Sequence, residues 1–296
     1  MRIGLIGNSQ VVGRVNASDI FGRYKTEERH EVRKPDVTGQ SYAEQVKRTR
    51  QMLRSMRPEA VSQIIEFHRG LNLFEALALA KREGKLIVPN DIHDRILNET
   101  KDRELLKQLY GAWVRTGTLV IYEKPYKPFG KKVVYRFEDD KAVQYSISFQ
   151  VPKQFRGLRN CALVVEHPNF EIKTVGENEY ELKSVDGANI RLIENFPTHS
   201  YSWYNTDSET KIPIGEPVKE SKEARYLWRL DGAYMGLLCR VFVDIDGNWG
   251  RDVDAVFGPS DVFGVALVEI GRDANVAGDI APIVRGVEQS EATTEK

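Results

Sequence analysis

The hydrophobic pattern of this chain changes at residues 124–132, and the change limits the folds that the chain can adopt. Before this segment, apolar residues recur at the helical spacing of about 3.6, between short runs of Leu, Ile and Val. After it, apolar and polar residues alternate with the period of two typical of strands. The segment itself, Lys124 to Lys132, contains two prolines, Pro125 and Pro128, which favour extended backbone. We therefore predict a Lys/Pro linker arm between two differently built regions.

The pattern predicts two domains and a tail. Residues 1–123 are expected to form a basic α/β domain, with a short parallel sheet and helices of the Rossmann-like type. Residues 133–285 are expected to form an acidic, β-rich, mostly antiparallel domain. The small and charged residues of 286–296 predict a disordered tail.

Cap residues predict where several helices begin and end. Ser41 and Glu44 have the spacing of a capping box, so a helix is expected from there to about Arg57. Asn72 is a second cap, for a helix that ends at Gly84. Further helices are predicted over 102–115 and over 219–227.

Composition favours a folded, soluble, cytoplasmic protein. The apolar share is 41% and the charged share 29%, typical of a globular chain. The sequence lacks a run of about 18 apolar residues and a secretory signal, so we expect no membrane partner. The 2 cysteines argue against a disulfide framework. High charge with few Cys and Met residues also fits a thermostable protein.

The net charge of zero conceals an uneven distribution. Residues 1–132 contain 25 Lys and Arg against 16 Asp and Glu, whereas residues 133–296 contain 18 against 27. One interpretation is a front half that binds a polyanion. The other is self-association, in which the two oppositely charged halves attract each other within or between chains.

The leading functional hypothesis is nucleic-acid binding through a basic helix face. Lys47, Arg50, Arg54 and Arg57 lie three or four residues apart, with Arg48 beside them, so a helix would present them as one stripe. The linker arm adds Lys124, Tyr126 and Lys127, which could combine charge with base stacking. DNA and RNA are not distinguished by this pattern.

A glycine pattern near the amino terminus favours a different class, an NAD(P)-dependent oxidoreductase. Gly7 and Gly13 follow a short apolar run, as in loops that bind a pyrophosphate, with Ser9 between them and Arg33 downstream. Gln10 stands where such loops place a second glycine, so the loop is degenerate. A purely structural or assembly protein is the third alternative.

Two acidic patterns suggest metal binding. Asp244, Asp246 and Asp252 surround a turn and could supply oxygen ligands, although Asp246-Gly247-Asn248 also fits a plain hairpin. The Glu-x-Lys triplets at 171–173 and 181–183 occur in nuclease metal sites and equally on exposed strand faces. These residues do not identify a catalytic group.

Overall fold

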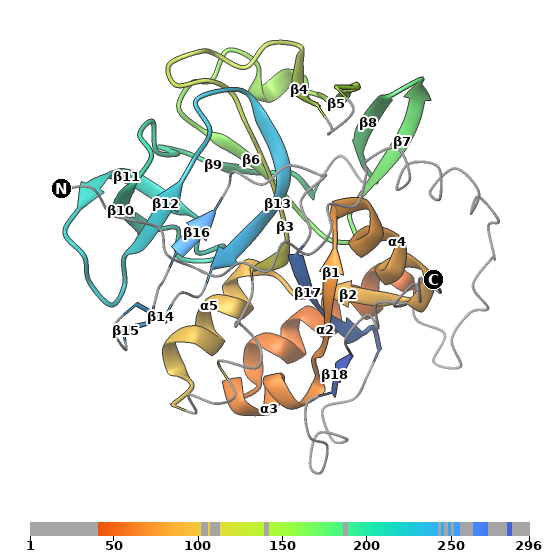
Figure 1. Ribbon diagram of the computed structural model, residues 1–296, viewed down its shortest axis with the longest axis vertical. Helices are drawn as coiled ribbons and strands as arrows, with labels where there is room; N and C mark the ends of the chain where they lie inside the picture. The colour runs from red at the N-terminus through yellow and green to blue at the C-terminus, as the bar shows by residue number, and fades with distance from the viewer. Residues whose placement is uncertain are drawn as a thin grey trace, which may run out of the picture.

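The fold was analysed in a computed structural model of the chain. The structure describes residues 41–101, 106, 113–138, 142–185, 189–240 and 263–271. It also describes the backbone of 241, 244–245, 248–249, 252–254 and 283–285. Within these ranges the protein is a mixed α/β structure that consists mostly of strands (Figure 1).

The helices lie early in the described chain. Their bounds are α2 Tyr42–Ser55, α3 Pro58–Ile64, α4 Leu73–Glu83, α5 Asn90–Glu99 and a 3-10 turn at Lys153–Phe155.

The strands alternate with the helices at first and then follow one another. The first nine are β1 Glu66–Leu71, β2 Lys85–Ile87, β3 Val114–Tyr122, β4 Lys132–Glu138, β5 Gln144–Gln150, β6 Ala162–Glu166, β7 Phe170–Gly176, β8 Glu179–Ser184 and β9 Arg191–Ile193. The others are β10 Ser202–Thr206, β11 Pro213–Val218, β12 Arg225–Trp228, β13 Tyr234–Val241, β14 Asp244–Ile245, β15 Asn248–Trp249, β16 Asp252–Asp254, β17 Phe263–Glu269 and β18 Ile283–Arg285.

The predicted helix caps are confirmed. The Ser41 side chain accepts a hydrogen bond from the Glu44 amide, and the Glu44 carboxylate accepts one from the Ser41 amide at 2.8 Å. Asn72 caps α4 in the same reciprocal way. That helix ends at Gly84, whose φ of 69° lies in the left-handed region that glycine adopts at low cost.

Among the described residues the large sheet has twelve strands, and a Rossmann-like arrangement is not confirmed. Its centre is β3, which pairs antiparallel with β13 and β6 and parallel with β17. Strands β1 and β2 do not pair with β3; both pair antiparallel with β17. The parallel sheet predicted for residues 1–123 is therefore not confirmed in the described chain. A run of apolar residues indicates that both faces of a strand are buried, but it does not indicate whether the strand pairs parallel or antiparallel with its neighbours.

Strands from both sides of residues 124–132 share this sheet, because β3 precedes the segment while β6, β13 and β17 follow it. The smaller sheet, in the order β4-β5-β8-β7, comes entirely from the region after the segment. The β-rich, mostly antiparallel character expected for that region is present in both sheets.

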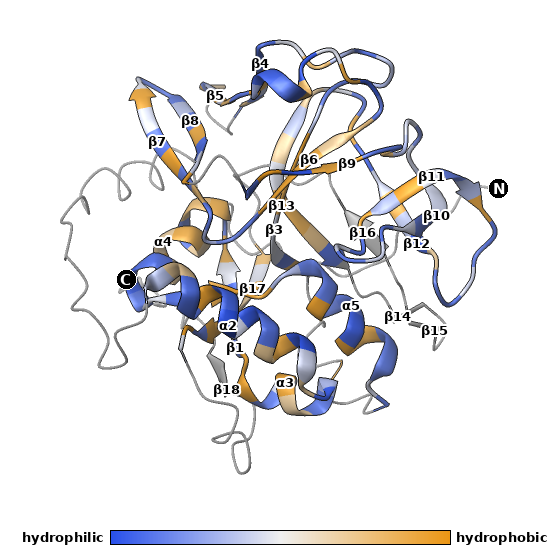
Figure 2. Cartoon of the chain, turned by 180° about the vertical axis from the view of Figure 1, so that it is seen from behind, coloured by the Kyte–Doolittle hydropathy of each residue, from blue (hydrophilic) through white to orange (hydrophobic). Residues whose placement is uncertain are grey.

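Two layers cover the large sheet. On one face, Val46 of α2, Val61 of α3 and Ile92 of α5 pack in one core with Ala266 and Val268 of β17. On the other, α4 and the smaller sheet pack against a core that includes Leu267, as expected from the alternation along a strand. Figure 1 shows α2, α3 and α5 together, away from β4, β5, β7 and β8. The mixed colours of α2 and α5 in Figure 2 are those of amphipathic helices.

Two predicted helices are corrected. The helix expected over 219–227 is wrong, because Arg225–Trp228 form β12, in which Arg225 and Leu227 are buried and Trp228 is exposed. The helix expected over 102–115 extends too far, since Val114 and Arg115 already belong to β3. Among the described residues, helices long and apolar enough to cross a membrane are absent.

Candidate functional site

The predicted basic face of α2 is divided by two side-chain contacts, of which one is an ion pair. Lys47, Arg48 and Arg57 are exposed to solvent. Arg50 instead donates to the carbonyl of His167, and Arg54 donates through Nε to Asp91 Oδ2 at 2.7 Å. Three of the five predicted phosphate contacts, Lys47 and Arg48 of α2 and Arg57 just beyond it, are thus at the surface.

Arg50 and Arg54 face the Glu166 carboxyl group at the end of β6, which is an unusually weak acid. The Thr118 hydroxyl donates to it, 2.9 and 3.0 Å from its two oxygens. Burial raises the pKa of the Glu166 carboxyl to about 7, and the nearby Asp91 carboxylate adds to the rise. The Arg50 and Arg54 charges and the Thr118 hydrogen bond oppose it. Such a carboxyl can exchange a proton near neutral pH.

A buried charge network lies beneath this group and fastens α5 to the large sheet. Asp94 of α5 accepts from Arg225 at 2.6 and 2.9 Å and from Arg240 at 2.7 Å. Arg240 also donates to Asn90 Oδ1, and Asn90 Nδ2 donates to the Thr210 carbonyl at 2.7 Å. These groups are all buried and hydrogen-bonded to one another, as structural charges are.

The 124–132 segment is attached to the body of the protein along its length. Phe129 is buried and exchanges backbone hydrogen bonds of 2.8 Å with Gly157 and Leu158. The Tyr126 amide donates to Asn160 Oδ1 at 2.9 Å, while its ring stays exposed. Lys124 and Lys127 are exposed too, although Lys127 Nζ lies 3.2 Å from the Glu123 carboxylate. All three arm residues predicted to contact nucleic acid are thus at the surface.

The docked arm lies against a second basic segment that sequence reasoning missed. Residues 151–159 contain Lys153, Arg156 and Arg159, all exposed, and the Val151 amide donates to the Lys131 carbonyl at 2.9 Å. We call the following exposed side chains of the two segments the basic surface: Lys124, Lys127, Lys131, Lys132, Lys153, Arg156 and Arg159. The signal in the sequence is the absence of Asp and Glu from both segments.

The other predicted site residues are not brought together in the described chain. Gly7, Ser9, Gly13 and Arg33, predicted to bind a dinucleotide, lie outside the described residues. Of the three predicted metal ligands, Asp246 also lies outside the described residues, whereas the backbones of Asp244 and Asp252 lie in β14 and β16. Ile245 pairs with Asn248 in an antiparallel β14-β15 pair, which agrees with the hairpin interpretation.

The two Glu-x-Lys triplets form a ladder of ion pairs. Each lysine lies near the glutamate of its own strand: Lys173 Nζ is 2.8 Å from Glu171 and Lys183 Nζ is 3.0 Å from Glu181. In the register of β7 and β8, Glu171 is opposite Lys183 and Lys173 is opposite Glu181. This alternation stabilises a strand pair without any metal.

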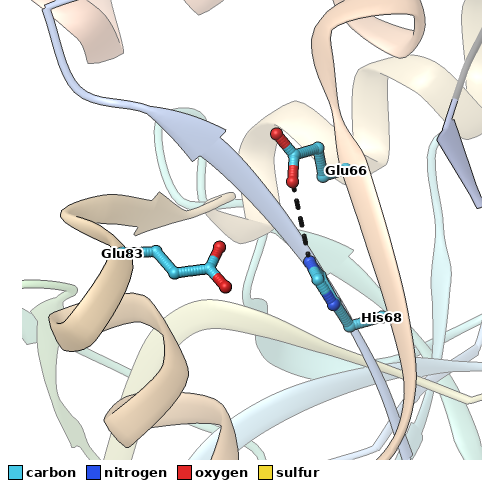
Figure 3. A group of neighbouring side chains, drawn as sticks. All are labelled: Glu66, His68 and Glu83. Atoms are coloured by element: carbon cyan, nitrogen blue, oxygen red, sulfur yellow. Dashed lines mark ion pairs between the residues drawn. The ribbon is translucent and has the colours of Figure 1, made fainter. Parts of the chain in front are cut away.

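A different group has the composition of a metal site. Glu66 and His68 of β1 and Glu83 at the end of α4 direct their ligand atoms to within 4.8 Å of one another (Figure 3). Lys85 lies between the two carboxylates, with Nζ 2.6 Å from Glu66 and 2.7 Å from Glu83. Its ammonium supplies the positive charge that a metal ion would bring, so the geometry favours a structural ion pair.

Comparison with other proteins adds no assignment. The chain matches no protein-family model, no curated protein and no solved structure.

Proposed function

We propose that the protein binds nucleic acid through the basic surface. The observation that carries the proposal is the presence of seven exposed Lys and Arg side chains on two hydrogen-bonded segments that contain no Asp or Glu. Lysine and arginine at this density neutralise phosphates and release the counterions condensed on them.

The partners of the basic side chains favour the basic surface over α2 as the main contact with nucleic acid. In the described chain, two of the five predicted α2 contacts are held, Arg50 by a carbonyl and Arg54 by a carboxylate. Of the seven side chains of the basic surface, Lys127 lies near the Glu123 carboxylate and Arg156 donates to the Val151 carbonyl at 3.0 Å. Backbone hydrogen bonds hold both segments in place, so little ordering entropy opposes binding. The exposed Lys47 and Arg48 of α2, with Arg57 just beyond it, are a second, independent set of candidates.

The test is fluorescence anisotropy of labelled DNA and RNA, single-stranded and double-stranded, from low to physiological salt. Binding should weaken steeply with salt, with a slope of about 0.7 to 0.9 for each phosphate contacted. The double variant Lys131→Glu/Lys153→Glu should weaken binding at least about tenfold and reduce the slope.

Two matched variants assign the contact. Lys219→Glu/Lys222→Glu makes the same change in charge at exposed lysines elsewhere and should leave binding nearly unchanged. Lys47→Glu/Arg57→Glu tests α2 and the residue just beyond it without disturbing the Arg54–Asp91 ion pair. A loss of affinity in the Lys47→Glu/Arg57→Glu variant alone would assign nucleic-acid binding to the α2 region instead of the basic surface. Absence of binding by the wild-type protein at low salt would refute the proposal.

A further inference from the structure

A row of aromatic side chains lies at the β10-β12 end of the large sheet. Trp203 and Tyr226 have ring centroids 5.5 Å apart, Tyr226 and Trp228 6.4 Å, and Trp228 and Tyr201 5.4 Å. Trp113 extends the row, 6.5 Å from Trp228. Figure 1 shows β10, β12 and β16 side by side in this part of the sheet.

The strand pairing explains why the rings gather on one face. Tyr226 and Trp228 alternate along β12 with the buried Arg225 and Leu227, so the two rings share the opposite face. Trp203 lies directly across from Tyr226 in the antiparallel β10-β12 pair. The row reaches solvent at Trp228, which is 37% exposed, and Tyr201, which is 65% exposed.

The exposed end of the row adjoins the basic surface. Tyr126, 60% exposed in the docked arm, has its hydroxyl 3.5 Å from that of Thr198. Thr198 is three residues before Tyr201, a separation that spans at most about 11 Å. Arg229 fixes the two segments to each other, because its guanidinium donates to the carbonyls of Glu123 and Pro197.

Both exposed tyrosines occupy a backbone conformation that bulky residues rarely adopt. The φ angles are 62° for Tyr126 and 59° for Tyr201, in the left-handed region where glycine and asparagine are favoured. The two rings remain 60% and 65% exposed, so burial of the side chain does not account for a tyrosine at either position. This points to a role of both rings outside the folding of the chain.

We infer that this surface selects single-stranded nucleic acid, with unpaired bases stacking on Tyr126, Tyr201 and Trp228 while Lys and Arg of the basic surface contact the phosphates. The inference rests on the proposed function and adds the class of ligand. In a duplex the bases are already stacked and paired, so only the phosphates are available to such a surface. In a single strand each base has a free face, and stacking on one aromatic ring improves affinity by about five- to a hundredfold.

Three probes of equal length separate the contributions of bases and phosphates: a dT20 strand, a 20-base-pair duplex, and an abasic 20-mer that has the phosphates without the bases. The wild-type protein should bind dT20 at least about tenfold more tightly than either of the others. Binding of dT20 should also quench tryptophan fluorescence, because Trp228 would lie under a base.

Substitution of the tyrosines distinguishes a binding role from a structural one. Tyr201→Gly and Tyr126→Gly relieve the left-handed backbone, so their thermal stability should be equal to or above that of the wild type. Each should nevertheless lose about fivefold or more in dT20 affinity, with the salt slope and duplex affinity unchanged. Tyr201→Phe keeps the ring and should retain wild-type affinity, as should Val185→Ala, which changes an exposed aliphatic residue elsewhere.

The outcomes separate this inference from the proposed function. Equal affinity for dT20, duplex and abasic strand, with no effect of Tyr201→Gly, would refute the single-strand inference and leave the basic surface intact. Absence of binding to all three would refute both. Binding of neutral polysaccharide, lost in Tyr201→Gly, would instead assign the aromatic row to sugars and overturn the inference.

Discussion

The Asp94 carboxylate and the Arg225 guanidinium form two parallel hydrogen bonds of 2.6 and 2.9 Å between residues 131 apart in the sequence. Arg240 donates to the same carboxylate at 2.7 Å, so one acid on α5 pairs with guanidinium groups from both β12 and β13. This fastens the helix layer to the strands that carry the aromatic row. The geometry of that row therefore depends on a charge cluster in the interior.

Asp94→Asn should destabilise the protein strongly. The substitution leaves two buried guanidinium groups without their countercharge, which typically costs about 3 to 5 kcal/mol. Urea denaturation at pH 7 measures the loss. Glu99→Gln, on the same helix, removes an exposed partner 3.7 Å from Arg95 and should cost less than about 1 kcal/mol. Equal effects of the two substitutions would contradict a special role for the cluster.

The contribution of Asp94 should disappear in acid. Burial raises the pKa of this carboxyl, but Arg240 and Arg225 lower it by more, so its pKa lies below the ordinary value of 3.8. Above that value the ionised carboxylate stabilises the native state, and the stabilisation is lost as the pH falls through the lowered pKa. The free-energy difference between wild type and Asp94→Asn should therefore be large at pH 7 and shrink below about pH 4. A constant difference from pH 7 to pH 3 would contradict this.

Glu166 should make stability depend on pH in the opposite direction. Burial raises its pKa to about 7 from the ordinary 4.5, so the folded protein holds a proton that the unfolded chain releases between these pH values. Stability therefore falls as the pH rises through this window. Glu166→Gln keeps an acceptor for Thr118 and removes the ionisation. Relative to wild type, the free energy of unfolding of this variant should rise by on the order of 1 to 2 kcal/mol between pH 5 and pH 8. This size of effect allows for the partial exposure of Glu166.

Local signals were sufficient for the helices with caps. Ser41 with Glu44, and Asn72 with Gly84, satisfy backbone groups within a few residues of themselves, so the sequence alone predicts α2 and α4. In the region 219–227 the Ser221 hydroxyl accepts from the Ala224 amide at 3.1 Å, as a cap would, yet a strand follows it. Arg225 is buried there because of Asp94, a partner that local pattern cannot reveal. Tertiary contact therefore decides that segment.

The sheet was the least predictable part for the same reason. Strand β17 pairs with β1, β2 and β3, although it follows all of them by more than a hundred residues. Short apolar runs identify strands but not their neighbours, so the strands of residues 1–123 were expected to form a sheet among themselves.

The candidate site was predictable only in part. The sequence identifies the positive charges on α2 and on the arm, but not which of them are neutralised. Arg54 meets Asp91, 37 residues away, and Arg50 meets a carbonyl 117 residues away. The missed residues 151–159 carry no helical or strand signal. They join the basic surface only because the arm docks beside them.

Gly117 should be among the least replaceable residues of the chain. A Cβ added there would lie 2.1 Å from the carbonyl oxygen of Ile87 and 2.9 Å from its carbonyl carbon, and both are backbone atoms that cannot rotate away. The Gly117 amide donates to the Val88 carbonyl at 2.7 Å, so the clash also opens that contact between β3 and the end of β2. Gly117→Ala should therefore destabilise the protein by about 3 kcal/mol or more.

Gly232→Ala is the control, since its Cβ would meet nothing within 4 Å, and its cost should stay near or below about 0.5 kcal/mol. Urea denaturation of the two variants measures the difference. A Gly117→Ala protein as stable as Gly232→Ala would mean that β3 does not pass this close to Ile87.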